Sequence, residues 1–564
     1  MLRLKQCVTM AVAISLFCFS SLAFAADKRD SIAKNGMVAA ADPNAAQIGV
    51  DILKKGGNAI DAAVATSFAL YAAEPHASSM AGGGFAIIYI AKEDKTYIVD
   101  YREVAPAKAY DKFYVDYEAK TKIPAKRAID TGWYSSGVPG MLAGMNELNK
   151  RFGTMPWADL MTPAITMLEK GIVVDKTLNG WITDMFARVE HSPTPDFFLN
   201  TYFKDGLPLE PGDTYYNNDL VKSYKLVAEK GADVFYKGEL ADKIAAVYAK
   251  HADGWITKKD LADYKITMRE PIEGMYRGYK VASVPPPSSG GLTIIEILNM
   301  LENFDLKKMG YGTPESIHTM IEAQKLAYAD RKEYMGDPAF VDVPVKQLSS
   351  PEYAAARAKT INPNKANTQV GPGNILKELK GNTTSFSAID KDGNMITITH
   401  TINAGFGAMV VPEGTGILMN NQMDDFEWKP GLANSVAAGK RPLSSMSPTL
   451  ISKDGKPFMT LGSPGGPRII AAVSNVIVNI IDHGMDVQAA NDTPRFYNPN
   501  TAKTAMENRF SKEVLDALKA KGQEPDLRKE LDTYFGGVHA IMVLPDGSLH
   551  GSGDIRRSGK GVGY

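Results

Sequence analysis

The chain has 564 residues, of which 44% are hydrophobic and 23% charged, a balance typical of a large globular protein with a buried core. Its formal net charge of -1 predicts no broad attraction to nucleic acid or to an anionic membrane surface. The eight histidines are scattered singly, so we expect neither a metal site nor a cofactor.

The first 25 residues have the pattern of a signal peptide. A basic start over residues 1–5 precedes an apolar run over residues 8–24, and Ala23 and Ala25 are the small residues of a cleavage site. An uncleaved membrane anchor is the weaker alternative, because the run is short for a span. We therefore expect a periplasmic or secreted protein without a stable membrane anchor. Since both cysteines lie in this segment, the mature chain has no disulfide and no cysteine nucleophile.

The first elements after this segment are two helices and a hairpin. Helical periodicity over residues 45–55 and 58–73 is interrupted by two glycines, which predicts a helix pair. Three glycines then open an apolar hairpin with strands over residues 85–91 and 97–101. Arg102 follows the second strand directly.

The middle of the chain is predicted to be mainly helical. This prediction covers residues 140–260 as a whole, with further helices near 292–302 and 318–332. Residues 361–382 are polar and contain Pro, Gly, Asn and Lys, which is typical of an exposed linker.

The pattern changes to strands at Thr383. Two β-patterned runs, 383–390 and 395–403, flank an Asp-Gly pair, which is the strongest short-range hairpin signal. A second strand pair is predicted over residues 449–452 and 458–463, followed by a helix from 468 to 482. Strand pairs that precede helices in both halves indicate an α+β fold in which helices face antiparallel sheets.

The register of the first hairpin follows from its turn. A two-residue turn would pair Lys391 with Asn394 and place Thr384 opposite Thr401, with Thr383 next to this pair. Period two then places four polar residues on one strand face: Thr397, Thr399, Thr401 and Asn403. On spacing alone, an ordinary exposed polar face is the favoured interpretation.

Three polar or glycine-rich segments are candidate site elements. Gly465 and Gly466 lie between a predicted strand and helix, where backbone N–H groups without helical partners can bind an oxyanion. A tight turn is the ordinary alternative. Segments 420–425 and 441–445 carry amide, carboxylate and hydroxyl groups, although composition alone favours solvated loops for both.

Ordered motifs along nearly the whole mature chain resemble the γ-glutamyltranspeptidase family. The motifs are GGNAIDAA (56–63), EPHAS (74–78), GGGF (82–85), REVAP (102–106), PPPSSGG (285–291), LAYADR (326–331), TT (383–384), DKDGN (390–394), LMNNQMDDF (418–426), RPLSSMSPT (441–449) and GSPGG (462–466). Because so many matches occur in the same order, the chain is identified as a member of this family.

The resemblance implies a fold and a maturation step. The family has the αββα sandwich of N-terminal-nucleophile hydrolases, in which two stacked antiparallel sheets are flanked by helices. Its precursor cleaves itself before the first threonine of the TT pair, which here is the bond between Asn382 and Thr383. After removal of residues 1–25, the products are a large subunit, 26–382, and a small catalytic subunit, 383–564, which form one heterodimer.

The resemblance also assigns the chemistry. Thr383 is the nucleophile, and its newly formed α-amine, with an ordinary pKa near ~8, is a suitable base. Thr401 orients Thr383, while the amides of Gly465 and Gly466 form the oxyanion hole. The resulting γ-glutamyl ester is passed to water or to an amino-acid or peptide acceptor. Glutathione or other γ-glutamyl compounds are the expected donors.

Six further residues match the family's glutamyl-binding positions. Arg102, Ser444 and Ser445 correspond to ligands of the α-carboxylate, and Asn403, Gln422 and Asp425 to ligands of the α-ammonium. Two features depart from the usual pattern. Ser385 replaces a common histidine, and the connection 426–443 is short, as in members that lack a lid over the pocket.

Other functions compete with this interpretation. A glutaryl or cephalosporin acylase of the same superfamily would use the same nucleophile, but Asp425 argues against it because a glutaryl group has no ammonium. A poly-γ-glutamate hydrolase and an inactive γ-glutamyl-binding protein are further alternatives. The Ser31-x-x-Lys34 pattern of penicillin-recognising hydrolases lacks a convincing partner motif.

Overall fold

The computed structural model describes residues 28–368, 370–371 and 382–564. The predicted signal segment and residues 372–381 of the predicted linker lie outside this range. Within these ranges, no helix is both long and apolar enough to cross a membrane.

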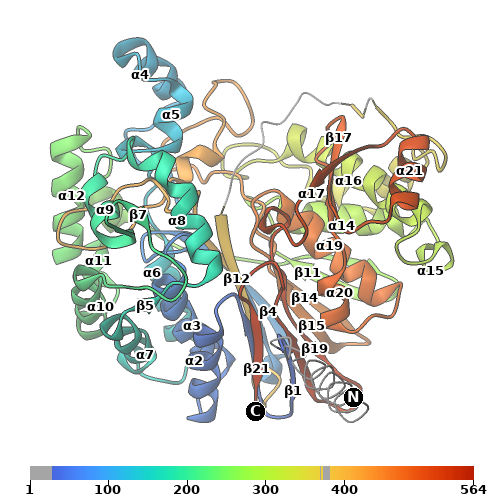
Figure 1. Ribbon diagram of the computed structural model, residues 1–564, viewed down its shortest axis with the longest axis horizontal. Coiled ribbons are helices and arrows are strands. Elements are labelled where there is room, and N and C mark those ends of the chain that lie inside the picture. Colours follow the sequence, from blue (N-terminus) through green and yellow to red (C-terminus); the bar gives the residue numbers. More distant parts are fainter. Residues whose placement is uncertain (1–27, 369, 372–381) are drawn as a thin grey trace, which may run out of the picture.

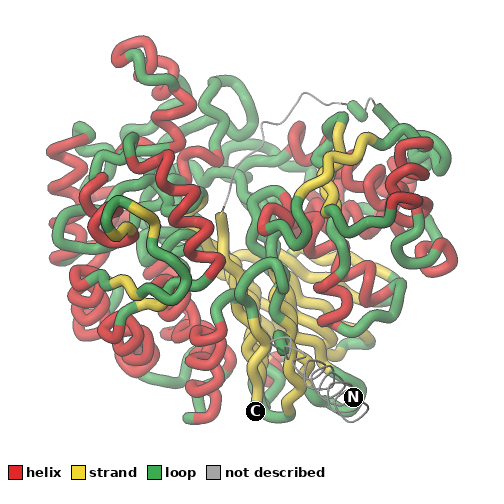
Figure 2. The backbone as a smooth tube through the Cα atoms, viewed as in Figure 1, coloured by secondary structure: helices red, strands yellow, loops and turns green. Residues whose placement is uncertain are grey.

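Two stacked seven-stranded antiparallel sheets form the centre of the molecule (Figures 1 and 2). The first sheet contains, in spatial order, β21 (Lys560–Gly563), β2 (Met37–Ala40), β12 (Asn382–Ile389), β13 (Met395–Asn403), β3 (Gly83–Ile90), β4 (Lys95–Asp100) and β9 (Thr267–Arg269). The second contains β1 (Asp30–Ala33), β20 (Leu549–Ser552), β19 (His539–Val543), β15 (Lys456–Gly462), β14 (Thr449–Lys453), β11 (Tyr279–Ser283) and β10 (Ile272–Tyr276).

Helices cover the outer face of each sheet and complete the αββα sandwich, which confirms the predicted fold class (Figure 1). Against the first sheet lie α2 (Pro43–Lys54), α3 (Ala59–Ala73) and α6 (Met141–Phe152), with α7 (Trp157–Lys170) packed on α3. Against the second sheet lie α14 (Gly290–Leu301), α19 (Arg468–Ile481) and α20 (Val487–Asp492), with α16 (Pro314–Tyr334) packed on α14.

The remaining elements extend these two layers. Beyond the first sheet they are α4 (Phe113–Thr121), α5 (Ala125–Asp130), α8 (Lys176–Val189), α9 (Pro195–Tyr202), α10 (Asn218–Lys230), α11 (Asp233–Tyr236), α12 (Glu239–His251) and α13 (Lys258–Asp263), with the short strands β5 (Ile172–Val173) to β8 (Thr214–Tyr215). Beyond the second they are α15 (Leu306–Met309), α17 (Val345–Leu348), α18 (Pro351–Ala358), α21 (Lys512–Ala520), β16 (Phe496–Tyr497), β17 (Lys503–Glu507) and β18 (Glu524–Arg528).

The central helix α3 shows how local sequence sets these boundaries. The Asn58 side chain accepts hydrogen bonds from the amides of Ile60 and Asp61, and the Asp61 carboxylate accepts one from the Asn58 amide. This capping box fixes the start of a helix whose residues are all buried. The predicted helix pair is therefore present.

The β12–β13 hairpin forms as predicted, but its register differs by one residue. The Asp390 carboxylate accepts hydrogen bonds from the amides of Asp392 and Asn394 at 2.9 and 3.0 Å, and Gly393 takes a positive φ of 82°. These contacts stabilise a three-residue loop instead of the assumed two-residue turn. Consequently Thr384 pairs with His400, so its predicted position opposite Thr401 is wrong.

A β-bulge lies at the start of β12, beside Thr383. The pairs Asn382–Asn403 and Thr384–His400 differ in register, which leaves Thr401 and the following residue of β13 opposite the single residue Thr383. Thr383 therefore faces Thr401 directly, and the strand bends at this point.

The polar face of this hairpin lies between the two sheets and is not exposed. Ser387 and Ser385 contact Thr397 and Thr399 through hydroxyl groups 2.9 and 3.1 Å apart. Thr397 also contacts Thr460 of the second sheet. Small hydroxylated side chains thus let the sheets approach closely next to Thr383.

Candidate active site

Thr383 lies at the start of β12 with only 3% of its surface exposed, and it lines a cavity of about 960 Å³. Its hydroxyl is 3.4 Å from the Thr401 hydroxyl. The Thr401 Oγ1 also accepts a 2.7 Å hydrogen bond from the Asn403 amide, which fixes its orientation at the bulge. The register of the β12–β13 hairpin therefore brings the predicted nucleophile and its predicted orienting group together.

Arg102 and Asp425 contact each other on the wall of the same cavity. Arg102 follows β4 and is 1% exposed, and it also donates to the carbonyls of Pro442 and Leu443 at 3.3 and 3.0 Å. Glu103 lies 3.7 Å from its guanidinium. Burial raises the pKa of Glu103 to about 8, against the opposing effect of Arg102.

The side-chain amides of Asn403 and Gln422, both predicted to bind the substrate ammonium, lie in different positions relative to the cavity. Asn403 lines the cavity and donates to the Asn421 carbonyl at 3.1 Å. Gln422 is fully buried and lies behind the cavity lining, where its amide donates to the Asp425 carboxylate at 2.6 Å. In this geometry Gln422 orients Asp425.

Ser444 and Ser445 line the cavity and are held by α16 and by the loop before α14. The Ser444 carbonyl accepts hydrogen bonds from the amide and hydroxyl of Ser289 at 2.9 and 2.6 Å. Arg331, at the end of α16, donates to the hydroxyls of Ser289 and Ser445 at 2.7 and 2.9 Å. Sequence analysis missed Arg331 as a site residue, although the LAYADR motif contains it.

The Gly465–Gly466 turn connects β15 to α19. Both glycines have positive φ angles, 128° and 56°, a conformation that side chains disfavour. The first backbone bonds of α19 run from Arg468 and Ile469 to the carbonyls of these glycines, whereas N–H groups at a helix start have no partner within the helix. Gly466 lines the cavity, and Gly465 lies buried beside it.

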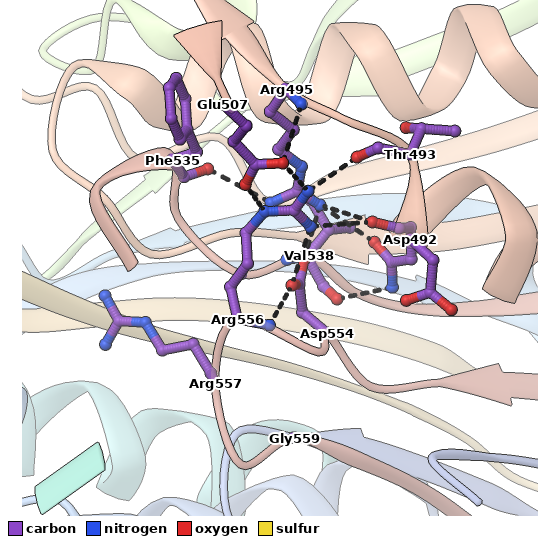
Figure 3. A network of polar contacts seen from close by, with 12 residues as sticks. Asp492, Thr493, Arg495, Glu507, Phe535, Val538, Asp554, Arg556, Arg557 and Gly559 are labelled. Carbon is purple, nitrogen blue, oxygen red and sulfur yellow. Dashed lines mark hydrogen bonds and ion pairs between the residues drawn. The ribbon is translucent and has the colours of Figure 1, made fainter. Parts of the chain in front are cut away.

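A buried ionic network, shown in Figure 3, holds the segment that packs against this turn. Its charged members are Arg495, Glu507, Asp554 and Arg556. Arg495 donates to the Phe535 carbonyl at 3.2 Å, and Asp554 accepts from the Val538 amide at 2.8 Å, so the network fixes the segment between them. A Cβ atom on Gly465 would lie 3.0 Å from Gly536 Cα in that segment. The Gly465–Gly466 turn thus packs against a backbone segment that the network holds by hydrogen bonds.

A buried threonine at a strand start, beside a glycine turn and inside an αββα sandwich, defines the class of N-terminal-nucleophile hydrolases. The family model described as Gamma-glutamyltranspeptidase matches residues 45–564. The chain therefore belongs to the γ-glutamyltranspeptidase family, as its motifs predict.

Known proteins show the same similarity. The glutathione hydrolase proenzyme of Escherichia coli (strain K12) is 44% identical over 539 residues, which are 93% of this chain and 91% of that protein. The crystal structure of cephalosporin acylase from Bacillus halodurans has a TM-score of 0.87 at 32% identity and covers 96% of this chain and 98% of its own. A chain of Helicobacter pylori γ-glutamyltranspeptidase has a TM-score of 0.55 at 39% identity, over 59% of this chain and 93% of its own.

Proposed function

We propose that this protein is an autoprocessed γ-glutamyltransferase and glutathione hydrolase. It cleaves γ-glutamyl amides through an ester on Thr383 and transfers the γ-glutamyl group to water, amino acids or peptides. The single observation that carries this proposal is the contact of Arg102 with Asp425 in the cavity that Thr383 lines. A guanidinium and a carboxylate at this spacing complement the carboxylate and ammonium of a glutamyl head group.

The maturation step creates the catalytic base. Cleavage between Asn382 and Thr383 would separate a large subunit, 26–382, from a small subunit, 383–564, and both contribute strands to the first sheet. It would also turn Thr383 into a chain terminus whose α-amine accepts the hydroxyl proton. The word proenzyme in the name of the E. coli relative supports this step.

The reaction follows from the placement of the groups. The Thr383 hydroxyl loses its proton to the α-amine and attacks the γ-carbonyl carbon, while the amides of Gly465 and Gly466 stabilise the oxyanion. The α-ammonium then protonates the leaving amine, which departs as the Thr383 ester forms. Water or an acceptor amine attacks the ester by the same route in reverse. Arg102, Ser444 and Ser445 hold the α-carboxylate, and Asn403 and Asp425, oriented by Gln422, hold the α-ammonium.

The proposal also covers the location of the protein. The pattern of residues 1–25 supports removal of a signal peptide, and the protein then acts in the periplasm or outside the cell.

A cephalosporin or glutaryl acylase is the second candidate, because the B. halodurans acylase has a closely similar structure. It would share Thr383 but bind an acyl group without an ammonium, so Asp425 distinguishes the two candidates. A poly-γ-glutamate hydrolase would use both Asp425 and Thr383, so Asp425 does not distinguish it from the first candidate. A serine hydrolase based on Ser31 is not supported, since the Ser31 hydroxyl donates to the Gly561 carbonyl at 3.0 Å, and Ser31 does not line the cavity.

Mass spectrometry and turnover of a γ-glutamyl anilide test the proposal together. The wild-type protein should give two fragments, the smaller beginning at Thr383. Thr383→Ala should remain one chain and lose activity by about 10³-fold or more, because the nucleophile is absent. Thr360→Ala, which changes an exposed threonine, should behave as wild type. An uncleaved wild-type chain with full activity would refute the proposal.

A further inference from the structure

The residue that follows the proposed nucleophile has its own buried partner. Successive side chains of a strand point to opposite faces, so Thr384 points away from the cavity that Thr383 lines. The Thr384 hydroxyl donates a 2.5 Å hydrogen bond to the carboxylate of Glu74, which directly follows α3. Thr384 is fully buried and Glu74 is 5% exposed.

The strand start needs such a partner because sheet pairing holds it on one side only. Within the described chain, β2 pairs with β12 from Phe386 to Ile389, and β13 alone pairs with the preceding residues. Cleavage would also move Asn382, which pairs with Asn403, to the other fragment. A chain end frays unless other contacts hold it. The bond from Thr384 to Glu74 is therefore a side-chain contact one residue from the new terminus.

The surroundings of Glu74 are built to hold its carboxylate in place. His76 lies 3.8 Å from it and stacks on Trp181, with ring centroids 5.6 Å apart. The Arg557 guanidinium lies 5.9 Å from the Trp181 ring, and in Figure 3 its side chain points away from the ionic network behind the oxyanion turn. Burial raises the pKa of Glu74 to about 7, opposed by Arg557 and by the Thr384 hydrogen bond. Either protonation state offers Thr384 an acceptor oxygen.

We infer that Glu74 and Thr384 are a positioning pair that ties the first residues of β12 to the end of α3. The pair keeps the hydroxyl and the α-amine of Thr383 directed at Thr401 and the cavity once the chain is cut. Neither residue touches the substrate. The inference rests on the proposed function of Thr383 as the nucleophile, and it adds two residues that act through it.

The direct test replaces the Thr384 hydroxyl without changing the size of the side chain. Thr384→Val should lower kcat for a γ-glutamyl anilide by about 10- to 100-fold, because small misplacement of a reacting group costs this much. KM should stay within about threefold, since the residues of the glutamyl pocket do not move. Thr384→Ser, which keeps the hydroxyl, should restore kcat. Thr66→Val is the matched control, because it removes a buried hydroxyl from α3, the helix that Glu74 follows, and it should leave kcat unchanged.

A double-mutant cycle then tests the partner. If the two residues act through each other, Thr384→Val should have little further effect on kcat in a Glu74→Ala background. Additive losses would overturn the inference, as would a Thr384→Val variant with more than half of the wild-type kcat, or equal losses for Val and Ser. Thr384→Val could also fold but stay uncleaved, with Thr384→Ser restoring cleavage. The inference then holds, because cleavage uses the Thr383 hydroxyl that the pair positions. An active Thr383→Ala protein would instead refute the proposed function itself.

Discussion

At the scale of single residues, the contact between Arg102 and Asp425 places a positive and a negative group side by side on the wall of the cavity. A zwitterion placed between them offers its carboxylate to Arg102 and its ammonium to Asp425, so one ion pair is replaced by two and no buried charge is left unpaired. A glutaryl amide would bind Arg102 through its single carboxylate but would leave Asp425 without a cationic partner. We therefore expect the pair to favour a glutamyl head group over a glutaryl one.

Replacing Asp425 tests this selection. Asp425→Ala should lower kcat/KM for a γ-glutamyl anilide by roughly 10²- to 10³-fold, because breaking a buried ion pair costs about 3–5 kcal/mol and Asp425, with 17% of its side chain exposed, belongs at the lower end of that range. Turnover of a glutaryl anilide should fall little or even rise, and cleavage of the chain should survive. Asp424→Ala is the matched control, since Asp424 lines the same cavity but pairs with Lys126 at 3.4 Å. If the wild-type protein prefers the glutaryl compound, the acylase candidate is correct.

Most of these residues could be identified from the sequence because the motifs fix their positions along the chain. The position of Gln422 behind Asp425 and the role of Arg331 could not. Both depend on how segments far apart in the sequence pack together. Arg331 reaches Ser445 across 114 residues, and no local pattern marks that contact.

At the scale of elements, the hairpin that carries Thr383 shows where local rules suffice and where they fail. The Asp-Gly pair correctly predicts the β12–β13 hairpin. The register also depends on the Asp390 carboxylate, which selects a longer loop, and on a bulge near Thr401. The longer loop shifts the pairing by one residue and so places Thr383 opposite Thr401, and the bulge shifts it back by one residue at Asn382 and Asn403.

The Gly465–Gly466 turn, the proposed oxyanion hole, is the second element in which backbone conformation matters. Gly465→Ala introduces a Cβ at a φ of 128° and within 3.0 Å of Gly536 Cα, so the turn must shift. Loss of one oxyanion donor typically lowers kcat by roughly 10²- to 10³-fold, and we expect an effect on the order of 10² here.

Gly455→Ala is the matched control for this substitution. Gly455 also has a positive φ, 74°, but nothing lies within 4 Å of its added Cβ. It should carry the conformational strain without the loss of kcat. Equal activities of the two variants, both fully cleaved, would contradict the assignment of the turn.

At the scale of the whole molecule, strand pairs that precede helices predicted antiparallel sheets faced by helices, and the family resemblance implied the αββα arrangement, but the strand order was not predictable. The central strand β12 pairs with β2, and β2 pairs with β21 at the opposite end of the chain. Such long-range pairings leave no local signal in short windows of sequence. They also place strands of both proposed subunits in one sheet, so we expect the subunits to remain associated after cleavage.

The size of the cavity leads to a prediction about its substrates. The short connection 426–443 forms part of the wall of a cavity of about 960 Å³, which is large for a single glutamyl group. Without a longer lid over it, water and bulky donors should reach the ester on Thr383. We therefore expect appreciable hydrolysis beside transfer, and kcat/KM values that differ by less than about tenfold between small and bulky γ-glutamyl arylamides. Product analysis with and without a dipeptide acceptor measures the first expectation, and a donor series measures the second. Turnover that depends strictly on the acceptor, or a steep decline with donor size, would show that this wall closes over the pocket.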